Sequence, residues 1–389
     1  MYLGRTVFSQ LMDFAPQHEF RRLVERHQAD YRLRHFSCWD QFLCMAFAQL
    51  TYRESLRDIE ACLRAAPSLY HLGIRSRSVA RSTLADANER RTWRLYADFA
   101  QLLIATARSL YSGDSFGVEL QNTVYALDST IIDLCLSLCP WARYGRTRGA
   151  IKLHTLLDLR GSIPSVIRIT AGRISDISML DQLIYEPGAF YVMDRAYVDF
   201  KRLRKLHEAG AFFVTRSWSN TRTRCIESHP VPADTAVAKD DIVQFSGVTS
   251  RYDFPAPARR ICVRESLDVK ALVFLTNQFE LPALTIADLY RSRWHIELFF
   301  KWIKQHLRIK AFYGCSENAV KTQIWIAIAV YLLVAIACKR LQLDVSLHSL
   351  LQVLSLTLLE KTPIPDLLLR YKLDQHGPPH DNQLNLFDF

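Results

Sequence analysis

The sequence predicts an α/β protein in which a mixed β-sheet follows a helical region and is interrupted by further strands. Apolar residues up to about residue 111 recur at helical intervals. From Thr123 onward the chain changes to short β-branched and aromatic runs separated by helical patterns. Residues 217 to about 280 hold several more β-like runs between turn signals. This order of elements is typical of a sheet with helices packed against it.

Residues 1–115 are expected to form a helical domain. Arginine supplies all of the Lys/Arg-type cations in this region. Arg90, Arg91 and Arg94 cluster on a predicted amphipathic helix, residues 85–103. A basic helix of this kind suits contact with DNA, and it is equally typical of an ordinary surface helix.

The rest of the chain divides by pattern into a sheet region in two parts, an all-β insertion and a tail. The sheet region comprises residues 116–216, together with helices of the same core at 286–370; the insertion comprises residues 217–285 and the flexible tail residues 371–389. The sequence predicts strands at 124–134, 150–159, 165–172, 189–197, 211–218, 242–248, 259–265 and 271–276, and helices at 178–185 and 200–210.

Composition limits the class of protein. The 389 residues are 49% hydrophobic, which excludes a disordered chain, and the formal net charge is +10. An excess of cations favours a polyanionic partner such as nucleic acid, although it also serves simple solubility. The nine cysteines are scattered and no signal peptide precedes them, so we expect reduced thiols in a cytoplasmic protein. Cys135 and Cys139 are not followed by a second pair of zinc-like spacing.

One apolar segment could be mistaken for a membrane span. Residues 324–338 are fifteen uncharged residues closed by Lys339 and Arg340. A spanning helix needs about twenty residues, so we expect a buried core helix and no membrane association.

A predicted helix at 286–309 carries one acid in the middle of a basic strip. At about 100° per residue, its apolar side chains gather on one face. The opposite face presents Glu297 with a tyrosine and four cations: Tyr290, Arg293, Lys301, Lys304 and Arg308. A solvated helix face usually mixes charges more evenly. A single acid flanked by cations suits a metal ligand beside phosphate contacts.

Two aspartates stand where apolar β runs end. Asp128 lies in VYALDST and Asp194 follows FYVM. A lone aspartate at such a place is more often a turn former or a helix cap. Adjacent strands could bring both carboxylates together, and a helix packed beside them could add Glu297. Three crowded carboxylates repel unless cations neutralise them, which is the logic of a two-metal site.

These residues resemble a known family. Tyr290, Arg293, Glu297 and Lys304 match, at every spacing, the Tyr-Arg-Glu-Lys signature of bacterial insertion-sequence DDE transposases of group four. The LDST and VMDRAY segments, the AIKLH strand and the N-terminal GRTVFSQLMDF stretch are also similar, so the resemblance covers nearly the whole chain.

The resemblance implies an RNase H-like catalytic core, a β insertion and an N-terminal DNA-binding domain. It further implies cut-and-paste transposition of inverted-repeat ends, through a hairpin, with two Mg²⁺ or Mn²⁺ ions held by Asp128, Asp194 and Glu297. A homodimer would join two ends, and the protein would work in the bacterial cytoplasm at the nucleoid. The family commonly has glycine where this chain has Ala196. Some relatives stack a tryptophan of the insertion on a flipped base. The insertion of this chain has one tryptophan, Trp218, near its start.

Several side chains are expected to contact DNA. Arg293 and Lys304 would bind phosphates beside the reacting bond. Tyr290 would hydrogen-bond a phosphate near the element's terminal nucleotides, and Trp294 could wedge against the duplex. Lys152 and His154 should share one face of their strand. The remaining expected contacts are Arg195, Lys301, Arg308, Arg143, Arg146 and Arg148.

Two other functions fit the same pattern. A structure-specific nuclease with the same core would nick DNA without joining ends. A non-catalytic DNA-binding protein descended from a transposase would have lost at least one acid, and all three are present.

The tail ends in a short apolar motif. Gln383, Leu384, Leu386 and Phe387 resemble the peptide by which bacterial replication and repair proteins dock on the sliding clamp. The preceding GPPHDN would act as a tether. The alternative is that these apolar side chains fold back on the protein's own core.

Overall fold

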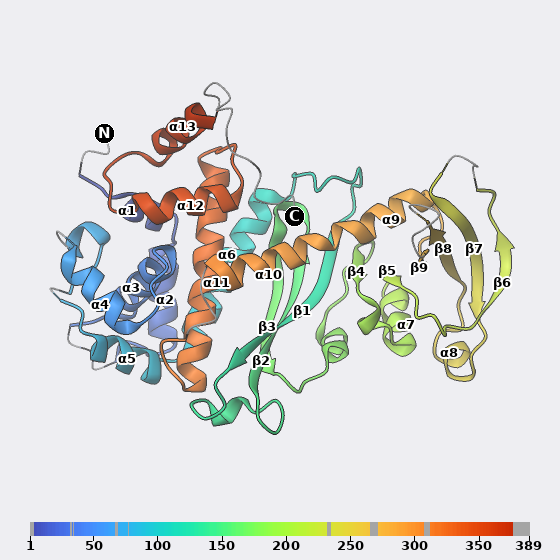
Figure 1. Ribbon diagram of the computed structural model, residues 1–389, viewed down its shortest axis with the longest axis horizontal. Helices are drawn as coiled ribbons and strands as arrows, with labels where there is room; N and C mark the ends of the chain where they lie inside the picture. Colours follow the sequence, from blue (N-terminus) through green and yellow to red (C-terminus); the bar gives the residue numbers. More distant parts are fainter. Residues whose placement is uncertain are drawn as a thin grey trace, which may run out of the picture. The chain divides into compact units, whose positions relative to one another are not determined.

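The computed structural model describes residues 4–31, 33, 35–66, 69–76, 78–231, 235–264, 271–306 and 312–375. The chain forms two compact units (Figure 1). The helical unit comprises residues 1–103, 305–314 and 318–389, and the sheet unit comprises residues 104–304 and 315–317. The sequence instead groups residues 286–370 with the sheet.

The helical unit is built from helices that precede the sheet unit in the sequence and from helices that follow it. Its helices are α1 (Val7–Met12), α2 (Gln17–Arg26), α3 (Cys38–Leu50), α4 (Leu56–Ala65), η1 (Leu69–Leu72), α5 (Arg81–Arg90), the first part of α6 (Trp93–Tyr111), α11 (Glu317–Arg340), α12 (Leu347–Thr357) and α13 (Ile364–Gln375). Ser37 and Asp40 form a capping box that fixes the start of α3. Phe20, Phe42 and Phe99 pack edge-on or tilted against one another in the core.

The predicted basic helix at 85–103 is wrong in one respect, because the chain breaks between α5 and α6. Arg91 lies at that break and is buried. Its guanidinium donates to the carbonyl oxygens of Phe36 and Ser37 and to Oε1 of Gln41. Arg91 therefore holds the fold together, whereas Arg90 and Arg94 are exposed.

The apolar segment at 324–338 lies within α11, which is 24 residues long. It is the one helix among the described residues that is long and apolar enough to cross a membrane. The length argument against a membrane span is therefore wrong. Burial supports the expected core helix, since 94% of its most apolar window lies inside the structure.

The sheet unit contains a mixed sheet, as the sequence predicts, and this sheet has nine strands among the described residues where the sequence predicts eight. Its spatial order is β3-β2-β1-β4-β5-β9-β8-β7-β6. β1 pairs in parallel with β4 and β4 with β5, while the other pairs are antiparallel. The strands are β1 (Val124–Leu134), β2 (Gly149–Asp158), β3 (Ile163–Ala171), β4 (Phe190–Met193), β5 (Phe212–Arg216), β6 (Thr223–Ser228), β7 (Val237–Phe245), β8 (Ala258–Val263) and β9 (Leu272–Thr276).

The insertion differs from the all-β prediction. It contains the short helix α8 (Val248–Asp253), and its strands extend the main sheet through the β5–β9 pair. β6 is absent from the predicted strands because nearly all of its side chains are exposed, which leaves no alternation of apolar and polar residues.

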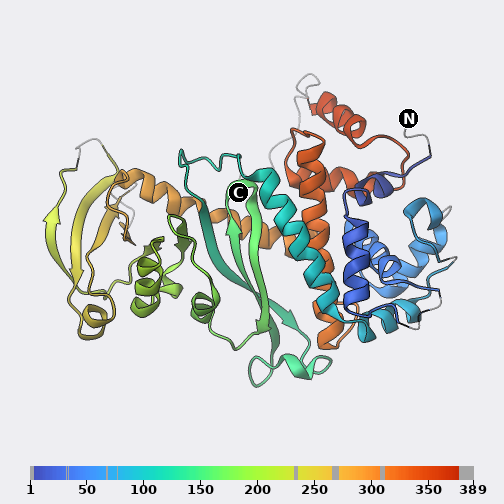
Figure 2. The same ribbon diagram turned by 180° about the vertical axis from the view of Figure 1, so that it is seen from behind.

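Alternation along the strands gives the sheet two differently covered faces (Figures 1 and 2). Leu127, Met193 and Leu275 point into a core cluster shared with η4 (Asp176–Gln182), η5 (Arg195–Tyr197) and α7 (Phe200–Glu208). Phe274 points the other way and packs on Tyr290 of α9 (Ala283–Ser292), with ring centroids 4.9 Å apart. Residues 128 and 194, which follow Leu127 and Met193, are therefore directed toward α9.

Arg91→Met should destabilise the helical unit by about 1–3 kcal/mol, because the hydrogen bonds from the guanidinium to Phe36 O, Ser37 O and Gln41 Oε1 would be lost. The matched variant Arg90→Ala changes an exposed arginine one residue away and should shift the melting temperature little. Thermal unfolding followed by circular dichroism compares the two. Equal melting temperatures for both variants would contradict the structural role of Arg91.

Candidate catalytic site

The two aspartates leave the sheet at the same edge. The parallel pairing of β1 with β4 ends at Leu127 opposite Met193. Asp128 and Asp194 are the next residues on their strands, so they lie side by side just past the last pair. Local hydrogen bonds orient both carboxylates. The N–H of Ser129 donates to Asp128 (2.8 Å), and the N–H of Arg195 donates to Asp194 (2.7 Å).

The third acid comes from a helix that is interrupted where the sequence predicts a continuous one. α9 ends at Ser292 and α10 (Trp294–His306) begins after Arg293. The Ser292 hydroxyl donates to the carbonyl of Leu289 (2.7 Å), and the N–H of Arg293 bonds instead to Tyr290 O (3.2 Å). A side-chain hydroxyl that competes for a helical carbonyl is a known cause of such a break.

Arg293 joins the acids across the sheet edge. Its guanidinium contacts Asp128 Oδ2 at 3.1 Å and Glu297 Oε1 at 2.5 Å. One turn earlier, the Tyr290 hydroxyl donates to Asp194 Oδ1 at 3.3 Å. The structure thus brings together the three acids and two signature side chains that are far apart in sequence.

The electrostatics of Asp128 reflect this crowding. Burial raises its pKa to about 6, and the charges of Asp194 and Glu297 add to the rise. The Ser129 N–H and the Arg293 guanidinium act in the opposite direction. Asp128 therefore binds a proton more readily than an ordinary aspartate, and a positive charge brought closer to it would favour the ionised carboxylate.

The chemistry of the donor set fits a hard divalent cation, because carboxylate oxygens are the ligands that Mg²⁺ and Mn²⁺ prefer. Within the described ranges, no three acidic, histidine or cysteine side chains are arranged to hold an ion as they stand. The reason is visible in the contacts, since Arg293 lies between Asp128 and Glu297. A metal held by these acids would take over the charge compensation that Arg293 now provides.

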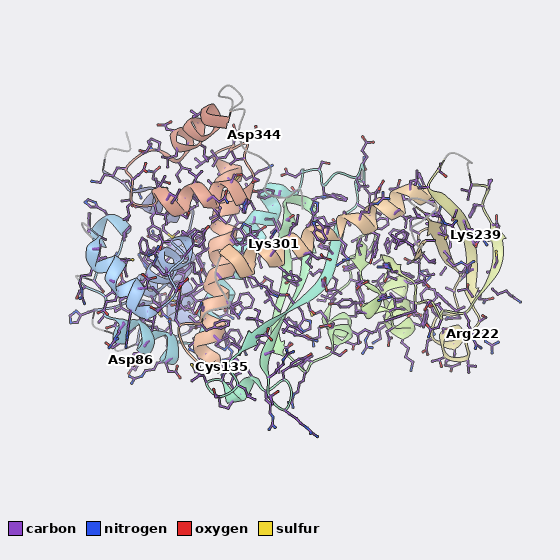
Figure 3. All side chains as sticks on the ribbon, viewed as in Figure 1. Asp86, Cys135, Arg222, Lys239, Lys301 and Asp344 are labelled. Atoms are coloured by element: carbon purple, nitrogen blue, oxygen red, sulfur yellow. The ribbon has the colours of Figure 1, made fainter. Side chains whose placement is uncertain are left out.

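Other predicted site residues on α10 face outward. Trp294 is 57% exposed, and Lys301 is exposed further along the helix (Figure 3). Lys304 is half-buried. Arg308 lies outside the described residues, as do Gln383, Leu384, Leu386 and Phe387 of the tail.

Arg195 and Trp218 form an exposed pair beside Asp194. The Arg195 guanidinium lies over the Trp218 ring, 5.0 Å from its centroid, and Trp218 is 42% exposed. The structure therefore places the insertion's tryptophan against Arg195, the residue that follows the second acid, which its position in the sequence does not reveal.

Lys152 and His154 do share a face of β2, but they do not form the DNA-facing surface that the sequence suggests. Both are buried. Lys152 Nζ lies 2.9 Å from Asp176 Oδ1, and His154 Nδ1 lies 3.8 Å from the same oxygen. Burial lowers the pKa of His154, which disfavours the charged form of the ring. Unlike Lys152 and His154, three arginines in the connection between β1 and β2 are exposed: Arg143, Arg146 and Arg148.

Sequence reasoning missed Asp176 and Tyr197. Asp176 comes from η4 and accepts a hydrogen bond from Ser129 Oγ (2.6 Å). Tyr197 is 1% exposed and lies near Asp128, Asp176 and Asp194, which raise its pKa in addition to the larger effect of burial. The VMDRAY segment contains Tyr197, but no local pattern marks Asp176.

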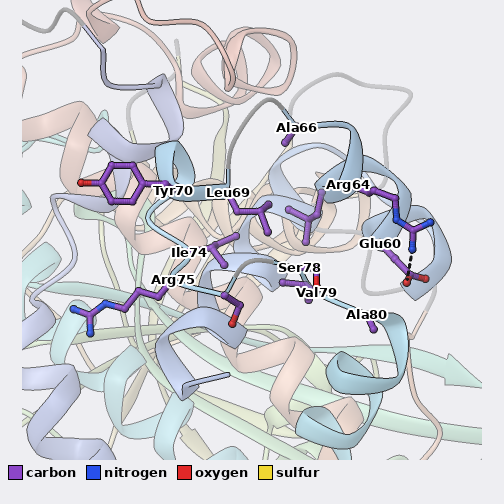
Figure 4. Close-up of a pocket in the computed structure, with 12 residues that line it drawn as sticks. Glu60, Arg64, Ala66, Leu69, Tyr70, Ile74, Arg75, Ser78, Val79 and Ala80 are labelled. Atoms are coloured by element: carbon purple, nitrogen blue, oxygen red, sulfur yellow. Dashed lines mark hydrogen bonds and ion pairs between the residues drawn. The ribbon is translucent and has the colours of Figure 1, made fainter. Parts of the chain in front are cut away.

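A separate cavity of about 490 Å³ lies in the helical unit between α4 and residues 69–80 (Figure 4). Glu60 and Arg64 form an ion pair at its wall (3.0 Å). The acids Asp128, Asp194 and Glu297 do not line it, so its volume is no guide to the chemistry.

Comparison with known proteins agrees with this geometry. Residues 119–333 match the family described as Transposase DDE domain, and residues 3–75 match a domain of unknown function, DUF4372. The chain is 34% identical over 260 residues to the putative transposase y4zB of Sinorhizobium fredii, covering 66% of this chain and 71% of that protein.

Two more relatives carry similar names. One is the probable transposase for insertion sequence element IS5377 of Geobacillus stearothermophilus, 31% identical over 53% of this chain and 54% of that protein. Another is the putative transposase for insertion sequence element IS4SA of Synechocystis, 24% identical over 67% of this chain and 73% of that protein. With a family match over more than half of its length, this chain belongs to the DDE transposases of insertion sequences.

Proposed function

We propose that Asp128, Asp194 and Glu297 are the catalytic acids of a transposase that cleaves the inverted-repeat ends of an insertion sequence and joins them to target DNA. The observation that carries the proposal is the set of contacts around Arg293. They join Asp128 and Glu297, while Tyr290 binds Asp194. The strand order β3-β2-β1-β4-β5, with β1, β4 and β5 parallel, supports an RNase H-like core.

The acids would hold two Mg²⁺ or Mn²⁺ ions. The chemistry such ions supply is activation of a water or a 3′-hydroxyl and stabilisation of the leaving oxygen. The protein's own cations would position the DNA. Arg293 offers a planar guanidinium for two phosphate oxygens, and Lys304 offers a point charge. Released from the carboxylates by bound metal, Arg293 would be available to a phosphate beside the reacting bond.

Exposed side chains around the acids would extend the DNA contact. Trp294 and the Arg195–Trp218 pair present aromatic surface, which suits stacking on an unpaired base. Lys301, Arg308 and the hairpin arginines Arg143, Arg146 and Arg148 would neutralise phosphates. The helical domain, with Arg90 and Arg94 exposed, would bind the element's ends. We place this activity in the bacterial cytoplasm, at the nucleoid.

Asp128→Ala, Asp194→Ala and Glu297→Ala should each abolish cleavage and leave end binding nearly unchanged, because the acids serve the reaction and the cations serve binding. Cleavage of labelled element ends in Mg²⁺, run beside gel-shift titrations, measures both properties. Hairpin and joined products in the wild type would distinguish a transposase from a structure-specific nuclease, which nicks without joining. Normal cleavage by any one of the three variants would refute the site.

Two chains should act together, since both ends of an element have to be cut in concert. This proposal rests on the resemblance to group-four transposases. Light scattering of the protein on end DNA should give two chains and two ends. A fully active complex of one chain with one end would exclude the dimer.

The C-terminal motif would dock this protein on the bacterial sliding clamp, directing insertion toward replicating DNA. A fluorescent peptide of residues 376–389 should bind purified clamp with micromolar affinity. The same peptide carrying Leu386→Ala and Phe387→Ala serves as the control and should not bind. Absence of binding by the natural peptide at high clamp concentration would end the proposal.

A further inference from the structure

The part of β1 that carries Asp128 is paired differently on its two edges. On one edge, pairing with β2 continues to Leu134. On the other edge, pairing with β4 ends at Leu127. Asp128 and Ser129 therefore stand just beyond the support of β4, and side-chain contacts have to hold this segment in place. A catalytic site needs such contacts, because a small displacement of a catalytic group lowers the reaction rate.

Ser129 contacts both Asp128 and a second carboxylate. Its N–H donates to Asp128 Oδ1 (2.8 Å), and its hydroxyl donates to Asp176 Oδ1 (2.6 Å). Asp128 is directed toward α9 and Arg293, whereas Ser129 points to the opposite face, where η4 lies. The strand is therefore held from both faces at this point.

Asp176 is anchored in turn by a buried cation. Lys152 Nζ lies 2.9 Å from Asp176 Oδ1 and also donates to the carbonyl of Ile174 (2.9 Å). The Lys152 side chain is 10% exposed, so its charge requires a partner. The buried ring of His154 lies beside the same carboxylate, with its Nδ1 3.8 Å from Asp176 Oδ1. The lysine and the carboxylate fix each other, which gives Ser129 a stationary acceptor.

Tyr197 of η5 lies beside this set of contacts. Its hydroxyl is buried and lies near the Ser129 side chain. Burial raises the pKa of Tyr197, and the nearby charges of Asp128, Asp176 and Asp194 add to the rise.

We propose that Asp176 is a positioning residue for Asp128, and that it acts through the Ser129 hydroxyl with Lys152 as its counter-ion. The proposal rests on the catalytic role of Asp128 given above. It assigns Lys152 and His154 a function in the site that is not DNA contact. Asp176 itself touches neither the DNA nor the reacting atoms in this account.

Asp176→Ala and Ser129→Ala should each lower the rate of end cleavage about 10–100-fold, the range typical of partners that orient a metal ligand. Mn²⁺ binding by the full-length protein, measured by electron paramagnetic resonance without DNA, should weaken in the same two variants. End binding in gel shifts should stay at the wild-type level. Asp176→Asn keeps an acceptor oxygen for Ser129 and should lose less than Asp176→Ala.

A double-mutant cycle separates positioning from general damage. If Asp176 acts through Ser129, the Asp176→Ala/Ser129→Ala double variant loses no more rate than the poorer single variant. Losses that multiply would overturn the proposal. Should Asp176→Ala fail to fold, the comparison of Ser129→Ala with Asp176→Asn decides, because Ser129→Ala is then expected to lose more.

Asp181→Ala is the matched control. Asp181 lies in the same segment, η4, and pairs with Arg202 (2.6 Å) and Lys205 (3.6 Å). It should cleave and bind Mn²⁺ as the wild type does. Asp128→Ala identifies which claim fails. If Asp128→Ala is inactive while Asp176→Ala and Ser129→Ala behave as wild type, this inference is wrong and the proposed function stands. Normal cleavage by Asp128→Ala removes the proposed function instead.

Discussion

The ion pairs of Arg293 with Asp128 and Glu297 are the interaction on which the rest of the site depends. Two carboxylates brought together at a partly buried edge repel each other. Burial raises the pKa of Asp128, and the charges of Asp194 and Glu297 add to the rise. One guanidinium at 3.1 and 2.5 Å compensates both charges and ties α9 and α10 to β1. The same constraint explains why the acids suit divalent ions, because any arrangement that keeps them close needs a cation among them.

The carboxylates that repel one another lie where the pairing of β1 with β4 ends. Parallel β1 and β4 end their pairing at Leu127 and Met193, so the next side chains can converge without the sheet's backbone bonds restricting them. Freedom of this kind has to be limited by other contacts. Arg293 supplies them on the α9 face, and the Ser129–Asp176 bond supplies them on the other. The carboxylate of Asp176 also needs a cation to compensate its charge, and the buried side chain of Lys152 provides it.

Much of this could be predicted from local sequence pattern. β1 has the predicted bounds, because its apolar run is bordered by turn residues. The spacing of Tyr290, Arg293 and Glu297 identified a helix face that the structure brings to the aspartates. The break at Arg293 could not be predicted, because it accompanies a hydrogen bond from the Ser292 hydroxyl to the carbonyl of Leu289 that the sequence does not reveal. Asp176 was likewise missed, because the first residue of a short 3₁₀ helix gains these partners only from tertiary structure.

The most direct test of the account is to locate the metal. Crystals of the protein grown with Mn²⁺ and end DNA, with data collected at the manganese absorption edge, give the ion positions by anomalous scattering. The account predicts peaks bound by Asp128, Asp194 and Glu297, with the Arg293 guanidinium moved from the carboxylates to a DNA phosphate. Manganese bound elsewhere, with Arg293 still paired to Asp128 and Glu297 on cleavable DNA, would contradict it.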